Sequence, residues 1–322
     1  MIPSSRLRLD LPGSLLRSVL LVSLSAFAMT ACGGSAGREP GPSTAEPAPI
    51  RVVATTTVLA DLVANVAGSR AVVSSLVPAG GVVETFDPSP SDVAAVAQAD
   101  LIVMNGLGLD EWAVDLIEDS GTTARVVELA EDLEGVDYLE GGEHEDGHGD
   151  GANPHLWLNV AYARLYAARI VETLVEADPD GAAAFRSEAE GYDARLAELD
   201  RSVRDRLAAI PAENRRIVSF HEAFPYFAAA YDLEIVGVVV EVPGQDPSAG
   251  EIAALVDAIR ASGARAVFGE AQFDPRLARA IAEEADVEVE TGLYNDSLGD
   301  PPADSYLGMM ELNAERIEAA LR

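Results

Sequence analysis

The sequence contains no lysine and only one cysteine, Cys32, and both shortages exclude chemistry. Without lysine the chain cannot form a Schiff base or build a Walker-type phosphate loop. With one cysteine it cannot form an intrachain disulfide. Its 22 basic residues, all arginine, face 54 acidic ones, giving a formal net charge of −32. Because so negative a surface repels phosphate backbones and attracts cations, nucleic acid is excluded as a partner and a cationic partner is favoured.

Aromatic residues make up only 6% of the chain, although 48% of it is hydrophobic. That apolar fraction is too high for a disordered polyelectrolyte, and 322 residues suffice for two domains. No GxGxxG string occurs; the only GxSxG string, at 33–37, lies in a Gly- and Pro-rich stretch, and the only HExxH string, at 144–148, lies in an acidic, glycine-rich run and not in a helical pattern. The sequence therefore gives no support to a nucleophile elbow, a dinucleotide fold or a zinc protease helix.

The first 31 residues predict a lipoprotein signal peptide. A basic stretch precedes the apolar residues 19–28, which are too few to span a bilayer. The following string, Met29-Thr-Ala-Cys32, resembles a bacterial lipobox with Met in place of the usual Leu. Residues 32–49 have the composition of a flexible tether. We expect an exported protein held on the outer face of the cytoplasmic membrane by a lipid anchor on Cys32; the alternative is an ordinary signal peptidase site.

From residue 50 onward, short Val- and Ile-rich runs alternate with helical patterns. This alternation fills residues 50–179 and returns over 211–322, which is typical of parallel sheets covered by helices on both faces. Between them, residues 180–210 are dense in Ala, Glu, Leu and Arg and predict one connecting helix of roughly 28 residues, or roughly 40 Å. The predicted fold class is α/β, with two βα lobes, mostly parallel sheets and one long rigid helix joining them.

Two of the four histidines lie near chain positions that suit a binding site. His155 precedes a helical stretch, and His221 follows a predicted strand; the other two, His144 and His148, lie in an acidic, glycine-rich run. A single histidine of this kind is more often a packed, hydrogen-bonded residue than a metal ligand. Only convergence with other ligand side chains would favour the second interpretation.

The chain resembles the metal-binding receptors of bacterial zinc and manganese ABC importers, the cluster A-I solute-binding proteins, from about residue 51 to 321. The resemblance is carried by the strings Glu84-Thr-Phe-Asp-Pro-Ser-Pro-Ser-Asp92, Asn153-Pro-His-Leu-Trp-Leu158, Ser219-Phe-His-Glu-Ala-Phe-Pro-Tyr-Phe227, Phe268-Gly-Glu-Ala-Gln-Phe273, Tyr294-Asn-Asp-Ser-Leu298 and Ser305-Tyr-Leu-Gly-Met-Met-Glu-Leu-Asn313. Members of that family bind one metal ion in a cleft between two lobes, with two ligands from each lobe.

The resemblance implies four ligands in this sequence. His155, His221 and Asp296 match family ligand positions directly. Where the family usually has a histidine, this chain has Glu84, placed there by alignment on the Phe and Pro that follow it. A carboxylate also ligates divalent ions, so Glu84 is expected to be the fourth ligand, with Asp87 as the substitute.

Two imidazoles and two carboxylates do not identify the metal. Zinc accepts nitrogen and oxygen donors in four-coordinate sites, whereas manganese prefers more oxygen donors and a higher coordination number. The segment 143–150, with His144 and His148, resembles the metal-trapping loop of many zinc receptors and could equally be a solvated acidic loop. On this basis we expect Zn²⁺, with Mn²⁺ (or iron) as the alternative.

The function that the resemblance implies is capture of one divalent ion and its delivery to an ABC permease in the membrane, by a monomer without enzymatic activity. Three alternatives stay open: a mononuclear zinc hydrolase with Glu222 as general base, a cell-adhesion protein, and a receptor for an organic ligand. A hydrolase would need an open coordination position, and an organic ligand an apolar cleft.

Overall fold

The computed structural model describes residues 48–141, 151–241 and 243–322 of the chain. The predicted signal peptide, the lipidation site Cys32 and most of the predicted tether lie outside these residues, as do His144 and His148. Within the described part, none of the helices is both long enough and apolar enough to cross a membrane.

The first half of the described chain forms a four-stranded parallel sheet in the order β2-β1-β3-β4. Its strands are β1 (Ile50–Ala54), β2 (Ala71–Ser75), β3 (Leu101–Met104) and β4 (Arg125–Glu128). Every residue of the central strand β3 is buried, whereas the edge strands β2 and β4 are half exposed. This contrast fits a parallel sheet whose centre is covered by helices on both faces.

The second half repeats the same topology in a second parallel sheet, with the order β6-β5-β7-β8. Its strands are β5 (Arg216–Ser219), β6 (Glu234–Val238), β7 (Ala266–Glu270) and β8 (Glu288–Leu293). We call each sheet with its covering helices a lobe. The fold class predicted from the sequence, two βα lobes with parallel sheets, is confirmed.

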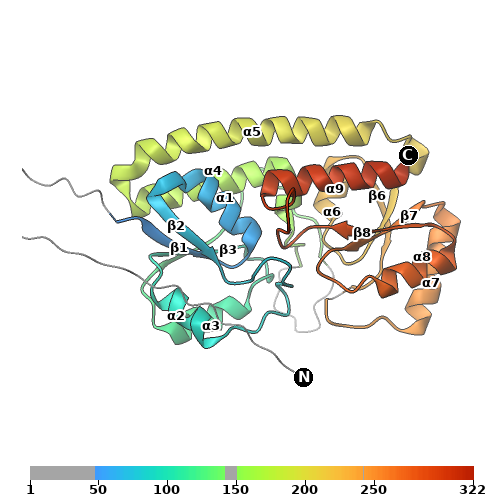
Figure 1. Cartoon of the computed structure of the whole chain (residues 1–322), viewed down its shortest axis with the longest axis horizontal. Helices are drawn as coiled ribbons and strands as arrows, with labels where there is room; N and C mark the ends of the chain where they lie inside the picture. Colours follow the sequence, from blue (N-terminus) through green and yellow to red (C-terminus); the bar gives the residue numbers. More distant parts are fainter. Residues whose placement is uncertain (1–47, 142–150, 242) are drawn as a thin grey trace, which may run out of the picture. The chain divides into compact units, whose positions relative to one another are not determined.

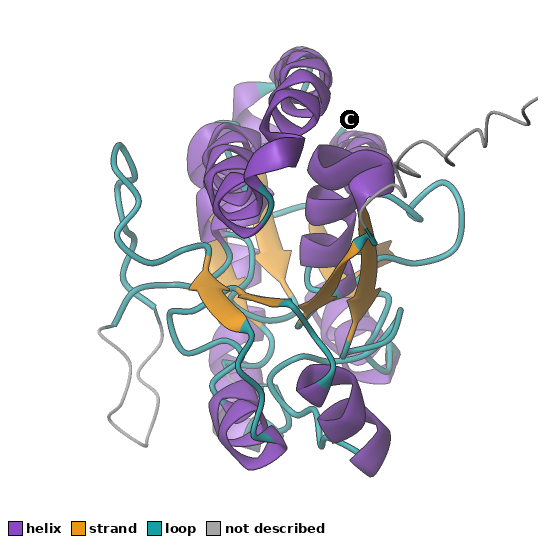
Figure 2. Ribbon diagram, turned by 90° about the vertical axis from the view of Figure 1, so that its left-hand side faces the viewer, coloured by secondary structure: helices purple, strands orange, loops and turns teal. Residues whose placement is uncertain are grey.

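Helices lie above and below the strands (Figure 2). The first lobe carries α1 (Thr57–Ala67), α2 (Pro90–Ala97), α3 (Trp112–Ser120) and α4 (Val160–Ala177), and the second carries α6 (Pro225–Ala230), α7 (Ala249–Ser262), α8 (Arg276–Ala285) and α9 (Tyr306–Leu321). Helix α2 begins with a cap at Ser89: Asp92 accepts a 2.7 Å hydrogen bond from the Ser89 backbone N–H, and Pro90 occupies the first helical position.

The two lobes are joined by α5 (Ala182–Ala208), a 27-residue helix that runs along both of them (Figure 1). A short 3₁₀ turn, Pro179–Gly181, separates it from α4 because a proline cannot continue the preceding helix. Its buried side chains form one stripe, which packs against α1 and α4 on one lobe and α9 on the other. The predicted connecting helix is therefore present, at almost the predicted length.

The packing of the hydrophobic core also joins the lobes. One continuous cluster includes Val103 of the first sheet, Leu199 of α5 and Phe268 of the second sheet. Two smaller clusters lie on the outer faces, under α2 and α3 in the first lobe and under α7 and α8 in the second. The helices that line the shared cluster thus fix the two sheets against a common apolar layer.

Candidate metal site

Four loops at the carboxyl ends of strands, or just before a helix, carry the predicted ligands. Glu84 lies in the loop between β2 and α2, and His155 immediately precedes the 3₁₀ helix Leu156–Leu158. His221 follows β5 directly, and Asp296 follows β8. In a sheet of order β6-β5-β7-β8 the connections diverge between β5 and β7, which is where α/β folds place their ligands.

The structure brings these four side chains together. One donor atom from each lies within 4.8 Å of the donor atoms of the other three. His155 Nε2 is 3.3 Å from Asp296 Oδ1, and His221 Nε2 is 3.5 Å from Glu84 Oε1 and 3.8 Å from Asp296 Oδ2. In a tetrahedral site with bonds of about 2.1 Å, neighbouring donors are roughly 3.4 Å apart. The observed spacing is therefore close to that of a four-coordinate ion.

The site is largely closed to solvent, and three of its four carboxylate oxygens lack a hydrogen-bond donor in the described part of the chain. His155, His221 and Asp296 are at most 4% exposed, and the Glu84 side chain is 19% exposed. Among the described residues, no donor reaches Glu84 Oε2 or either oxygen of Asp296 within hydrogen-bonding geometry. Since a buried carboxylate without donors is costly, these oxygens are suited to a bound cation.

The ring of His221 is oriented by a buried carboxylate that the sequence analysis did not assign a role. Glu270, the last residue of β7, places Oε2 2.7 Å from His221 Nδ1. The Glu270 carboxylate also accepts hydrogen bonds from Asn295 Nδ2 at 3.1 Å and Gln272 Nε2 at 3.2 Å. With Nδ1 engaged in this way, Nε2 of His221 is the nitrogen that faces Glu84 and Asp296, an arrangement common around metal-ligating histidines.

The ring of His155 is likewise oriented through its Nδ1, here by the side-chain amide of Asn153. Asn153 Oδ1 accepts a 3.0 Å hydrogen bond from the backbone N–H of His155 and lies 3.1 Å from its Nδ1. Like Glu270, Asn153 stands inside a string that carries the resemblance. The only sequence signal for a role of these two residues was a polar side chain among mostly apolar neighbours. It does not identify their partners, because His221 is 49 residues from Glu270 and the contact of Asn153 with His155 depends on the local turn.

The charged groups of the site shift one another's pKa values. Burial, together with the neighbouring Asp296 carboxylate, raises the pKa of Glu84 to about 7. Burial and the Glu270 carboxylate raise the pKa of Asp296 to about 7, against the opposing effect of His221. Burial disfavours the His221 imidazolium, but the carboxylates of Glu270, Asp296 and Glu84, with the hydrogen bond to Glu270, together outweigh burial and raise the pKa of His221 to about 10. Without metal at neutral pH, His221 therefore carries a positive charge.

Glu84 reaches the site because its loop is fixed on both sides. Trp112 Nε1 donates a 2.9 Å hydrogen bond to the carbonyl of Val83, and the backbone N–H of Gly80 donates a 2.6 Å hydrogen bond to Ser297 Oγ in the second lobe. Asp87, the substitute first ligand, is exposed and is not part of the cluster of four. The loop therefore presents Glu84, rather than Asp87, to the other three side chains.

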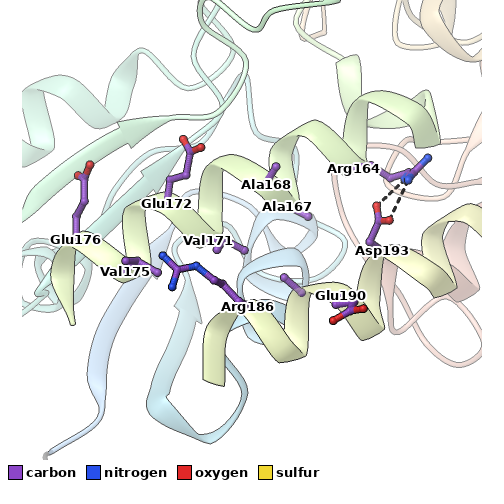
Figure 3. Close-up of a pocket in the computed structure, with 11 residues that line it drawn as sticks. Arg164, Ala167, Ala168, Val171, Glu172, Val175, Glu176, Arg186, Glu190 and Asp193 are labelled. Carbon is purple, nitrogen blue, oxygen red and sulfur yellow. Dashed lines mark hydrogen bonds and ion pairs between the residues drawn. The ribbon is translucent and has the colours of Figure 1, made fainter. Parts of the chain in front are cut away.

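A separate groove of about 620 Å³ lies between α4 and α5 (Figure 3). Its apolar floor includes Val171 and Val175, and Arg164 and Asp193 form an ion pair at its rim with a 2.6 Å contact. None of the predicted ligands lines this groove. It is a surface furrow between two packed helices and has no part in the proposed metal chemistry.

Comparison with known proteins agrees with the fold and with a metal-binding role. Residues 52–320 match the family described as zinc-uptake complex component A, periplasmic. The manganese-binding lipoprotein MntA of Halalkalibacterium halodurans is 32% identical over 274 residues, 84% of this chain and 88% of that protein. The manganese ABC transporter substrate-binding lipoprotein PsaA of Streptococcus anginosus is 30% identical over 314 residues, 95% of this chain and 98% of that protein.

Solved structures show the same fold. The periplasmic zinc-binding protein TroA of Treponema pallidum superimposes with a TM-score of 0.76 at 26% identity, over 85% of this chain and 99% of that one. Two lobes with parallel sheets, a bridging helix and four converging candidate ligand side chains are the features of a substrate-binding protein of the metal-transport class. The chain belongs to the zinc-uptake complex component A family. This membership confirms the expectation of a binding component and not an enzyme.

Proposed function

We propose that the protein captures one divalent transition-metal ion between its lobes, with Glu84 and His155 from the first and His221 and Asp296 from the second. The observation that carries this proposal is the convergence of four donor atoms within 4.8 Å, with carboxylate oxygens that accept no hydrogen bond among the described residues. The names of the relatives, metal ABC transporter lipoproteins, support delivery of the ion to a membrane permease.

Capture requires no covalent chemistry. The ion is drawn in by the negative protein, loses water and replaces the proton on His221, whose pKa of about 10 keeps it charged until then. Glu84 and Asp296 offset the two positive charges of the ion, so the pair of carboxylates that is costly when empty becomes favourable when loaded. Since the ligands come from both lobes, the loaded ion also holds the lobes together.

The lipid anchor belongs to this proposal. Relatives that span nearly the whole chain are named lipoproteins, and the string ending at Cys32 is similar to a lipobox. Several acyl chains hold a protein on a membrane far more firmly than one. Mass spectrometry of the protein extracted from membranes with detergent tests this step, because acylation at Cys32 adds the mass of the lipid to the mature N-terminal peptide.

Zinc and manganese are both candidate cargoes. Zinc is the ion that the acidic segment with His144 and His148 favoured, and one solved relative is named a zinc-binding protein. Manganese is favoured by a separate observation: Glu84 Oε2 and both oxygens of Asp296 accept no hydrogen bond within the described part of the chain, so two carboxylates could each bind through two oxygens. Two imidazoles and four carboxylate oxygens, three of them without a hydrogen bond among the described residues, would meet the preference of manganese for oxygen-rich, higher coordination.

The test is elemental analysis of protein purified without added metal, followed by competitive titration with Zn²⁺ and Mn²⁺. We expect one ion per chain in the wild type and a loss of at least 100-fold in affinity when His155 and His221 are both changed to Ala. As a matched control, a chain lacking residues 143–150 should keep one ion. Equal loading of the double variant would show that the ion binds elsewhere.

A further inference from the structure

We propose that Asn153 is a positioning residue that holds His155 through its amide oxygen and the loop that carries His221 through its amide nitrogen. The inference rests on the proposed function and concerns how firmly the ion is kept. Asn153 is 2% exposed and lies two residues before His155. Its side chain spans from the segment that leads into α4 to the loop that follows β5, and so from one lobe to the other.

The oxygen end selects the ring nitrogen that faces the ion. Asn153 Oδ1 accepts from the His155 backbone N–H at 3.0 Å and lies 3.1 Å from His155 Nδ1. Because an amide oxygen can only accept, Nδ1 must carry the ring proton in this contact. The lone pair of the neutral ring is then on Nε2, the atom that lies 3.3 Å from Asp296. Asn153 thus holds His155 in the tautomer that can bind a metal.

The nitrogen end reaches the other lobe. Asn153 Nδ2 donates a 2.7 Å hydrogen bond to the main-chain carbonyl of Glu222, the residue directly after His221. Rotating the amide by half a turn would place its NH₂ group against the His155 N–H and its oxygen against the Glu222 carbonyl. Both contacts would then be repulsive, so the two ends of the amide specify one orientation.

The backbone of Asn153 is itself anchored. Its N–H donates to the carbonyl of Leu139 at 2.8 Å, and its carbonyl accepts from the hydroxyl of Tyr226 in the second lobe at 3.1 Å. Asn153 is therefore tied to both lobes through its backbone as well as its side chain, so its amide is held in a fixed place between His155 and the loop that follows β5.

The test compares the rate at which Zn²⁺ and, in separate samples, Mn²⁺ pass from the loaded full chain to excess chelator. Asn153→Ala removes both contacts and should speed dissociation of the ion about 10- to 100-fold. Asn153→Asp keeps an acceptor for His155 but removes the donor to Glu222, so it should speed dissociation by about tenfold. Asn159→Asp is the matched control: it adds the same charge nearby, and its oxygen can still accept from Ala161 N at the start of α4.

A second readout separates positioning from a merely structural role. In ¹⁵N spectra of the metal-free protein, the His155 ring should be in the Nδ1–H form in the wild type and in Asn153→Asp, and a mixture of forms in Asn153→Ala. If Asn153→Ala does not fold, the Asp variant and this spectrum decide. Unchanged dissociation in folded Asn153 variants, or an equal effect of Asn159→Asp, overturns the inference. A wild type that binds neither ion would instead overturn the proposed function.

Discussion

Replacing Asp296 with asparagine should stabilise the metal-free protein while nearly abolishing metal binding. Asp296 is 1% exposed, and no donor within the described residues hydrogen-bonds either of its oxygens. Its pKa, raised from 3.8 to about 7, measures the cost of keeping the carboxylate ionised there. About three pKa units correspond to roughly 4 kcal/mol at high pH. The buried NH₂ group of the new asparagine costs about 1–3 kcal/mol in return, so we expect a net gain of about 1–3 kcal/mol.

The stability difference between Asp296→Asn and the wild type should depend on pH. Because the pKa of Asp296 is higher in the folded state, the unfolded chain loses the proton first as the pH rises above 4, and the wild type loses stability until about pH 7. The gain from Asp296→Asn should therefore be complete above pH 7, whereas near pH 4 only the cost of the buried NH₂ group should remain and the variant should be less stable than the wild type. Chemical denaturation of the metal-free proteins at pH 4, 6 and 8 measures it directly.

The control for this experiment is Asp205→Asn, the same change at an exposed position of α5. It should alter the free energy of unfolding by no more than about 0.5 kcal/mol at any of these pH values. Metal added to the wild type should raise its midpoint of unfolding, and the same metal should leave Asp296→Asn nearly unchanged. A variant that is destabilised at pH 8, or that keeps wild-type affinity for metal, would refute the reasoning.

Three further predictions concern the same site. Glu84→His should shift the preference toward Zn²⁺ over Mn²⁺ by about tenfold or more, because it replaces an oxygen donor by nitrogen, and competitive titration would show an unchanged ratio if Glu84 were no ligand. At pH 7, metal uptake should release about two protons, one from His221 and about half of one from each of Glu84 and Asp296, so metal affinity should rise with pH. Calorimetry in buffers of different ionisation enthalpy measures the number of protons released, and zero release would contradict the pKa values. Glu270→Ala should weaken metal binding about 10- to 100-fold, with partial recovery in Glu270→Gln, which keeps an acceptor for His221 Nδ1; equal affinities of the two variants would argue against a positioning role.

Much of the fold could be predicted from the sequence because each element satisfies a local rule. Buried central strands read as short apolar runs, as in Leu101–Met104 and Ala266–Glu270. The long connecting helix follows from a helical composition between Gly181 and Ala208 that only Gly191 interrupts. What the local pattern did not give was strand order or the core shared by both lobes, because these depend on contacts between segments far apart in the chain.

The candidate site likewise has features that the sequence could predict and features that depend on contacts between distant segments. His155, His221, Asp296 and Glu84 were expected from a resemblance, and the structure places them together, but no periodicity in the sequence relates four positions on four separate loops. Glu270 was not assigned a role, since a glutamate at the end of a predicted strand is usually exposed, and only the fold places His221 beside it. A donor set can thus be read from single residues, whereas its orienting partners require the three-dimensional arrangement.

The packing between the lobes also limits how the protein can open to take up an ion. The hydrophobic cluster that contains Leu199 of α5 continues into both sheets, so a wide hinge would expose apolar surface. Hydrogen bonds from Leu298 N to Thr57 Oγ1 at 2.8 Å and from Trp157 Nε1 to the Asn295 carbonyl at 3.0 Å also cross between the lobes without involving a metal ion. We therefore expect loading to be accompanied by loop and side-chain shifts and not by rotation of whole lobes.

This limit can be measured by electron–electron distance spectroscopy. With Cys32 changed to Ser, spin labels on cysteines replacing Ala94 of α2 and Ala280 of α8 report the separation of the two lobes at exposed positions. The mean distance should differ by no more than about 2 Å between metal-free and loaded protein, since each lobe then moves by only about 1 Å. A label pair within one lobe, on Ala94 and Glu118, controls for rotamer changes of the labels. A change of several ångströms between lobes but not within one would mean that the shared core parts on release, and that α5 bends to allow it.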